Sequence, residues 1–281
     1  MAKNKPGPFL WKLRMILEYK LVMPVLLLLK RLFFLLFGQK SVRVNIGGGN
    51  FIKPGWLSMD YQSETYPYRL SLLDQNFDLT SGKPFPFADN SVDFFYSQHT
   101  LEHIPQEHCA FIFAEMYRCL KPGGAVRLNM PDYDIAYRAA KAGNLDFFPD
   151  RERIRSSFAL CLLDRFATGL IGRVDVAEVE RDLATLEKDE FAEKYAAAVP
   201  RETQLENFGN HINWWNYAKL ERMFKAAGFS QAYGSGPQQS RFAEMRGKGH
   251  FLGLEKLVAL DKLTGFDSAH QEQSVYGEAV K

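Results

Sequence analysis

Three consecutive glycines directly follow a short apolar run, and this feature constrains the fold more than any other. The run occupies residues 42–46 and is followed by Gly47, Gly48 and Gly49. Glycine is needed where the backbone takes positive φ, or where a Cβ atom would block a close approach. The sequence therefore predicts a strand that leads into a tight loop. Either the loop brings backbone close to a ligand or it is merely a turn.

A second short strand is predicted over residues 56–60, and it favours the interpretation that the glycine loop belongs to a ligand site. It ends on Asp60, and a carboxylate at a strand tip is well placed to accept hydrogen bonds from ribose hydroxyls. A nicotinamide dinucleotide site is disfavoured, because Ile52 stands where its third glycine belongs. The distance from Gly47 to Asp60 is also shorter than the ~20 residues expected for that motif.

Strand-like and helix-like segments alternate after this point, which is typical of an α/β fold. A helix over residues 107–120 should stop at Lys-Pro-Gly-Gly, which combines a cation, a proline and glycines that accept positive φ. Another helix, over 216–227, should be capped by Gly228. The remaining predicted strands are residues 76–79, 92–97, 125–130, 230–233 and 274–280.

The order of these motifs resembles the class I S-adenosylmethionine-dependent methyltransferases. The motifs are Asn-Ile-Gly-Gly-Gly-Asn, Ser-Met-Asp, Phe-Asp-Leu, Ser-Gln-His-Thr-Leu-Glu-His-Ile and Leu-Lys-Pro-Gly-Gly. They are most similar to the small bacterial branch whose glycine loop leads almost directly into the second strand. The likeness covers residues 42–134 and, more loosely, 208–281. It implies a Rossmann-like, seven-stranded, mostly parallel sheet with helices on both faces and an antiparallel last strand.

The resemblance also implies the cofactor, S-adenosylmethionine, and the residues that bind it. The glycine loop would approach the methionine portion, and Asp60 would bind the ribose hydroxyls. Asp78 would accept from the adenine amino group, Leu79 would contact the ring, and Ser97 would face the methionine end. The full expected set is Gly47, Gly48, Gly49, Asp60, Asp78, Leu79 and Ser97.

A general base is harder to assign from the sequence. His99 follows a strand tip and is the leading candidate, while Asp132 and His211 are the others because the chain re-enters the site at each. His99, like His103, could instead be a capping or core histidine. His99 and His103 have the i,i+4 spacing of metal ligands, with Glu102 beside them, but no third ligand is recognisable, so no metal is predicted.

The chain divides into four expected parts. Residues 1–40 form a basic, apolar, helical leader; residues 41–134 and 208–281 form the methyltransferase core; residues 135–207 are a helical insertion. Helices are predicted over 135–142, 151–166 and 176–198. We expect this insertion to be a lid over the acceptor, with a surface decoration as the alternative.

The leader carries the positive charge of the chain. The whole chain has a net charge of only +2, so a uniform nucleic-acid-binding surface is not expected. Lys30 and Arg31 interrupt the apolar run, whereas a membrane span needs about 20 apolar residues. An amphipathic helix on an anionic membrane surface is favoured over packing, a homodimer contact or a span. On a helical projection Lys12, Lys20, Lys30 and Arg31 share one sector.

Three functions follow as hypotheses. The first is methyl transfer to an oxygen of a glycan or lipid-linked saccharide by a cytoplasmic enzyme, peripheral on the inner membrane face. The second is methylation of a soluble metabolite or protein. The third is a non-catalytic binding protein with the same fold. The three cysteines lack paired spacing, which indicates reduced thiols.

Overall fold

The computed structural model describes residues 23–37, 41–49, 53, 55–62, 74–148, 154, 157–246 and 271–281. The first part of the leader, with Lys12 and Lys20, lies outside the described residues, as does the segment 247–270.

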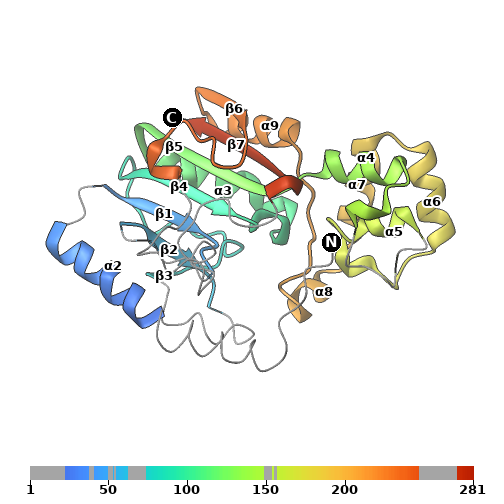
Figure 1. Ribbon diagram of the computed structural model, residues 1–281, viewed down its shortest axis with the longest axis horizontal. Coiled ribbons are helices and arrows are strands. Elements are labelled where there is room, and N and C mark those ends of the chain that lie inside the picture. The colour runs from blue at the N-terminus through green and yellow to red at the C-terminus, as the bar shows by residue number, and fades with distance from the viewer. Residues whose placement is uncertain are drawn as a thin grey trace.

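A seven-stranded sheet forms the centre of the molecule, in the order β3-β2-β1-β4-β5-β7-β6 (Figure 1). β7 is antiparallel to both of its neighbours, while the pairs β1–β2, β1–β4, β2–β3 and β4–β5 are parallel. The expected mostly parallel sheet with an antiparallel last strand is therefore confirmed. The strands are β1 (Arg43–Ile46), β2 (Leu57–Asp60), β3 (Gln75–Asn76), β4 (Val92–Gln98), β5 (Leu120–Pro131), β6 (Gln231–Ser235) and β7 (Ser274–Val280).

The connection between β1 and β2 is unusually short for a parallel pair. Val44 pairs with Leu57 and Ile46 with Met59, although parallel strands are normally joined through a helical crossover. Residues 47–49, 53, 55 and 56, which the structure describes in this connection, contain no helix. The glycine loop thus passes almost directly into β2, as expected.

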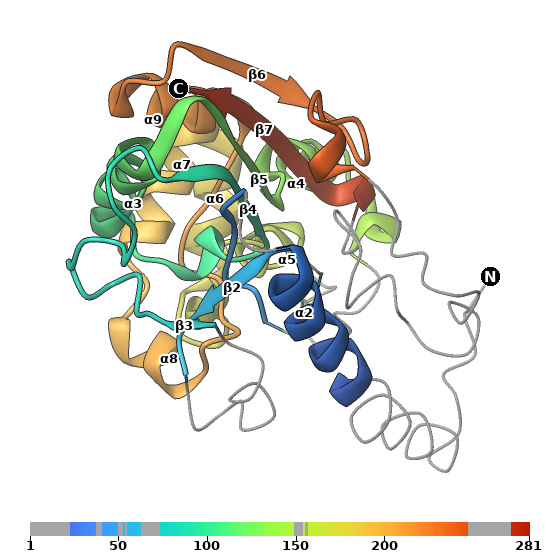
Figure 2. The same cartoon turned by 90° about the vertical axis from the view of Figure 1, so that its left-hand side faces the viewer.

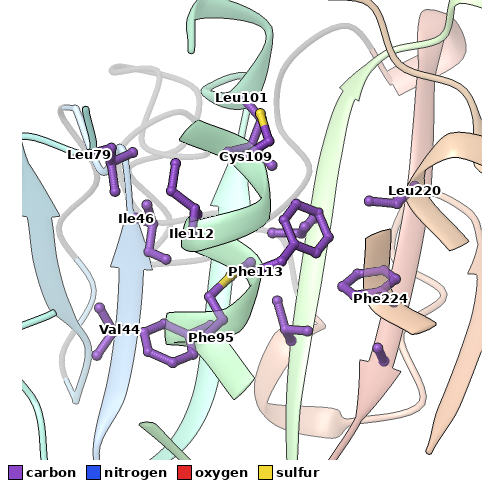
Figure 3. Close-up of a cluster of buried hydrophobic side chains, with 14 of the residues drawn as sticks. Val44, Ile46, Leu79, Phe95, Leu101, Cys109, Ile112, Phe113, Leu220 and Phe224 are labelled. Atoms are coloured by element: carbon purple, nitrogen blue, oxygen red, sulfur yellow. The ribbon is translucent and has the colours of Figure 1, made fainter. Parts of the chain in front are cut away.

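Helices α3 (Gln106–Cys119) and α9 (Tyr217–Ala227) pack together on one face of the sheet. Asn216 caps α9 by accepting from Lys219 N at 2.9 Å, and Gly228 ends it with a φ of +102°. The apolar side chains of these helices meet those of the strands in the main core (Figure 3). This core includes Val44, Ile46, Phe95, Ile112, Phe113, Leu220 and Phe224.

Helix α2 (Met23–Phe37) lies on the opposite side of the sheet from α3 (Figure 2). Lys30 attaches it to the sheet, because its ammonium group is 2.5 Å from Asp74 Oδ2 and its side chain is buried. Lys30 and Arg31, expected on one sector of the helix, have different surroundings, because Lys30 is buried and Arg31 is exposed. No helix of the described residues is long and apolar enough to cross a membrane.

The insertion after β5 forms a helical lobe beside the sheet (Figure 1). It has its own hydrophobic core, which includes Phe166, Phe191 and Trp214. The next residue, Trp215, belongs to the sheet core and stacks on Phe113 at a centroid distance of 6.0 Å. The lobe contains α4 (Tyr133–Lys141), α5 (Phe158–Leu163), α6 (Val176–Thr185), α7 (Lys188–Ala197) and α8 (Arg201–Glu206).

Four expected boundaries are wrong. Of the helix predicted over 151–166, α5 occupies Phe158–Leu163, because Ser157 before it is extended. The helix predicted over 176–198 is two helices, because the chain is extended at Leu186 and Glu187. β5 begins at Leu120 rather than at residue 125, and Lys-Pro-Gly-Gly bulges out of the strand between the pairs Val92–Leu120 and Phe94–Ala125. β3 is shorter than residues 76–79 because its end forms a turn.

Candidate active site

A cavity of about 340 Å³ opens where the carboxyl ends of β1, β2 and β4 meet. Gly47 follows β1, Asp60 ends β2 and His99 follows β4, and all three line the cavity. The direction of strand order reverses between β1 and β4. Ligands of open α/β sheets bind outside the carboxyl ends of the strands at such a switch point.

The glycine loop is folded tightly against its neighbours. Gly47 has a φ of +65°, and a Cβ atom there would lie 2.0 Å from Thr100 Oγ1. A Cβ atom on Gly48 would lie 2.1 Å from Ser58 Oγ. Only glycine therefore fits at both positions, Gly47 for its conformation and Gly48 for its close approach.

Asp60 links the glycine loop to the cavity. Its Oδ2 accepts from Gly49 N at 2.8 Å and its Oδ1 accepts from Tyr61 N at 2.7 Å. A carboxylate oxygen has two acceptor positions, so Asp60 can hold the loop and still accept from hydroxyls of a ligand.

Asp78 and Leu79 form another part of the cavity wall. Asp78 Oδ1 accepts from both the backbone N and the Oγ1 of Thr80, each at 2.8 Å. These bonds fix the orientation of the carboxylate. Leu79 is nearly fully buried, and Phe77 adds an aromatic surface to the same wall. A polar acceptor beside apolar surface suits a heteroaromatic base.

Three of the expected donor-binding residues do not line the cavity. Gly48 and Gly49 lie behind Gly47 in the loop, so their effect is on its shape. Ser97 is buried, and its Oγ has no hydrogen-bond partner among the described residues.

His99 has both ring nitrogens engaged. Nδ1 lies 3.0 Å from Glu102 Oε1 and Nε2 lies 3.0 Å from Ser274 Oγ. His99 also has a φ of +49°, which is uncommon for a residue other than glycine. Burial alone would raise the pKa of Glu102, but the hydrogen bond from His99 and the neighbouring histidines outweigh it and hold this pKa well below its usual range. The ionised carboxylate orients the imidazole.

The other two candidate bases lie outside the cavity wall. Asp132 is the N-cap of α4 and accepts from Asp134 N at 2.9 Å and from Ile135 N at 3.4 Å. Burial raises the pKa of Asp132. His211 is held behind His103, with ring centroids 4.9 Å apart, and burial lowers its pKa to about 4. Neither side chain reaches the cavity described here.

Several cavity residues have little signal in the local sequence. Arg201, Leu205 and Phe208 come from α8 and the segment after it, and they close the cavity from the side of the insertion. Phe208 contacts Tyr61 at a ring-centroid distance of 6.2 Å. The i,i+4 spacing of Arg201 and Leu205 places them on one helix face, which is the one hint that the sequence contains.

Comparison with known proteins gives one family. Residues 60–128 match the methyltransferase domain family. A curated protein, phosphoethanolamine N-methyltransferase 2 of Caenorhabditis elegans, is 35% identical over 54 residues, which are 19% of this chain and 12% of that protein. The chain therefore spans about an eighth of the length of this curated relative.

Similar solved structures are also methyltransferases. A S-adenosylmethionine-dependent methyltransferase of Archaeoglobus fulgidus is 11% identical, with a TM-score of 0.41, over 98% of this chain and 100% of the other. One from Mesorhizobium loti is 15% identical, with a TM-score of 0.40, over 85% and 90% of the two chains. Phosphoethanolamine N-methyltransferase 2 of Haemonchus contortus, solved with S-adenosylmethionine, is 15% identical, with a TM-score of 0.38, over 90% and 52%.

Proposed function

We propose that this chain, a class I S-adenosylmethionine-dependent methyltransferase by its motifs and its fold, methylates an oxygen of a glycan or lipid-linked saccharide at a membrane surface. The observation that supports methyl transfer most directly is the cavity at the carboxyl ends of β1, β2 and β4, lined by Gly47, Asp60 and Asp78. These residues come from separate segments of the chain and line one cavity, which supports the proposal.

The cavity residues fit S-adenosylmethionine. Gly47 presents backbone instead of a side chain, because Thr100 occupies the space that a Cβ atom would need. Asp60 would accept from the ribose hydroxyls, and Asp78 with Leu79 would hold the adenine. When bound, the cofactor supplies an already activated methyl group. The protein then needs to align the acceptor and remove its proton.

His99 is the proposed general base. With Nδ1–H donated to Glu102, its Nε2 carries the lone pair that accepts from Ser274 Oγ. An acceptor hydroxyl would take the place of Ser274 and pass its proton to Nε2. The ionised Glu102 would stabilise the imidazolium that forms, as a carboxylate partner does for other catalytic histidines.

The insertion supplies the proposed acceptor side of the site. Among the described cavity residues, Arg201 is the one lysine or arginine. Its guanidinium suits a carboxylate or phosphate of the acceptor. The curated relative is a phosphoethanolamine N-methyltransferase, whose acceptor carries a phosphate. A soluble phosphorylated acceptor is therefore the alternative that the experiment must separate.

Helix α2 supports the proposed location at a membrane. Its exposed apolar residues fall within about 100° of a helical projection, the width of an apolar helix face. Lys30, on the opposite side, faces the sheet. The stripe therefore points away from the domain and could enter a bilayer interface. It consists of Val25, Leu28, Leu32, Leu35 and Leu36, with exposed fractions between 38% and 78%.

Transfer of label from S-adenosylmethionine tests the function. The full-length protein should label a component of a lipid and saccharide extract, and Asp60→Asn should lower donor affinity about tenfold or more in calorimetry, because it removes charge-assisted hydrogen bonds. His99→Gln should retain donor binding but lose transfer. Label that appears only in soluble metabolites would show that the acceptor is a soluble metabolite and not a lipid or saccharide. Absence of donor binding would refute methyl transfer.

Sedimentation with vesicles tests the location separately. The full-length protein should bind vesicles rich in anionic lipid, less strongly as salt rises. Leu35→Glu with Leu36→Glu should reduce this binding, whereas Phe111→Glu, at an exposed apolar position on α3, should not. Equal binding by the two variants would show that the stripe does not contact lipid.

A further inference from the structure

Three side chains of the metal-ligating type meet beside the donor cavity. Glu102, His103 and His211 each offer a ligand atom, and these atoms lie within 4.8 Å of one another. Glu102 is fully buried, and His103 also lines the cavity. The proposed methyl transfer uses neither His103 nor His211.

The two imidazoles are oriented as ligating histidines are. His103 Nδ1 lies 3.0 Å from Asn210 O, and His211 Nδ1 lies 2.7 Å from Arg165 O. A carbonyl oxygen only accepts, so each Nδ1 carries a proton and each Nε2 carries the lone pair. Bonds from the other ring nitrogen to a backbone carbonyl are the usual support of metal-bound histidine. His103 Nε2 lies 3.9 Å from Glu102 Oε1.

The carboxylate provides a second, independent observation. Glu102 Oε1 is bonded to His99, but Oε2 is a buried atom without a hydrogen-bond partner among the described residues. Leaving such an atom unsatisfied is costly, more so for a charged group. A cation in contact with Oε2 would compensate it.

Three backbone hydrogen bonds hold the cluster together. Ile212 N and Asn213 N donate to the carbonyl oxygen of Glu102 at 2.9 and 3.1 Å, so the segment with His211 is fixed against the loop after β4. Thr168 N of the insertion donates to His211 O at 3.0 Å. The histidines are therefore held by the main chain and not only by their own torsions.

We propose that Glu102, His103 and His211 bind one divalent first-row transition metal ion, for which Zn²⁺ is the best fit. Two imidazoles and one carboxylate are the ligand set of open zinc sites. Bond lengths of 2.0–2.2 Å require ligand atoms roughly 3.3 Å apart, so the cluster must contract by up to about 1.5 Å, which side-chain rotation provides. Because His103 lines the cavity, the remaining coordination position faces it and can take an oxygen or nitrogen ligand.

Calorimetry with Zn²⁺ on the full-length, chelator-treated protein, without donor, tests this site. We expect one equivalent to bind. His103→Ala should weaken binding about tenfold or more, since even outer-shell substitutions commonly cost that much. His211→Ala should do the same. The matched control is His108→Ala, a half-buried histidine on α3 outside the cluster, which should bind as the wild type does.

The absorption spectrum of the Co²⁺ form gives a second readout, since its visible bands should change in His103→Ala and not in His108→Ala. Circular dichroism of the metal-free variants establishes that they are folded. Wild-type affinity no greater than that of a folded His103→Ala or His211→Ala would overturn the site. Donor binding, measured without metal, stays a separate test, so failure of the metal site and failure of the proposed methyl transfer can be told apart.

Discussion

Substitution of Gly47 by alanine should destabilise the fold by more than its backbone conformation alone explains. Gly47 and Gly82 have φ values of +65° and +66°. A Cβ atom on Gly82 would meet no heavy atom within 4 Å, whereas on Gly47 it would lie 2.0 Å from Thr100 Oγ1. The pair therefore separates backbone strain from steric overlap at matched φ.

The magnitudes follow from these two effects. Left-handed backbone costs an alanine about 1–2 kcal/mol, which is the whole loss that we expect for Gly82→Ala. Overlap with packed atoms adds about 1–3 kcal/mol, so Gly47→Ala should lose about 2–5 kcal/mol. Urea unfolding at pH 7 without donor, followed by tryptophan fluorescence, measures both.

A double variant tests the assigned cause. Thr100→Ala removes the two side-chain atoms that would lie 2.0 and 2.4 Å from the new Cβ, although Thr100 Cβ, at 2.7 Å, remains. Gly47→Ala should therefore cost less in the Thr100→Ala background, by about 0.5 kcal/mol or more. The reasoning is refuted if Gly47→Ala loses no more stability than Gly82→Ala, or if its loss is the same in both backgrounds.

A buried lysine and a buried ion pair give further predictions. Burial lowers the pKa of Lys219 to about 8 from 10.5, so the unfolded state holds this proton to higher pH and stability should rise between about pH 8 and 10.5, by at most about 1.4 kcal/mol per unit. Urea unfolding should show that Lys219→Met loses this rise of unfolding free energy with pH. Lys225→Met, at the exposed Lys225 on the same helix, should keep it. Equal slopes in the two variants would contradict the assignment. Arg127 and Glu278 form an ion pair of 2.5 Å with both side chains fully buried, so Glu278→Gln should cost about 3–5 kcal/mol. Replacing both Arg127 and Glu278 by apolar residues should recover most of this lost stability. A small loss of stability in Glu278→Gln would refute the prediction.

The sequence predicts the structure best where a feature depends on residues that are close together in the chain. The glycine loop and Asp60 at the end of β2 follow from local patterns of apolar residues, glycines and strand ends, and the bounds of β7 follow from the resemblance of the last segment to the family's final strand. The bulge in β5 was missed because Lys-Pro-Gly-Gly stops a helix equally well, and only pairing with β4 shows that it lies within a strand.

Residues whose roles depend on distant contacts could not be assigned from the sequence. Lys30 and Arg31 share one sector of the helical projection, yet Lys30 pairs with Asp74 beside the sheet. The sequence offers His211 as a candidate base, but its place beside Glu102 and His103 depends on the chain returning from the insertion. The sequence offers no third ligand near His103 because that ligand is supplied by the fold.

The consecutive residues Trp214 and Trp215, which belong to different hydrophobic cores, have a consequence for how such a protein can diversify. The helices after β5 bury their apolar surface mainly among themselves, so substitutions there leave the packing of the sheet intact. Substitutions in the insertion can therefore reshape the surface that these helices present while the core of the sheet keeps its packing. The tryptophan pair is the junction at which these two independently packed cores meet in the chain.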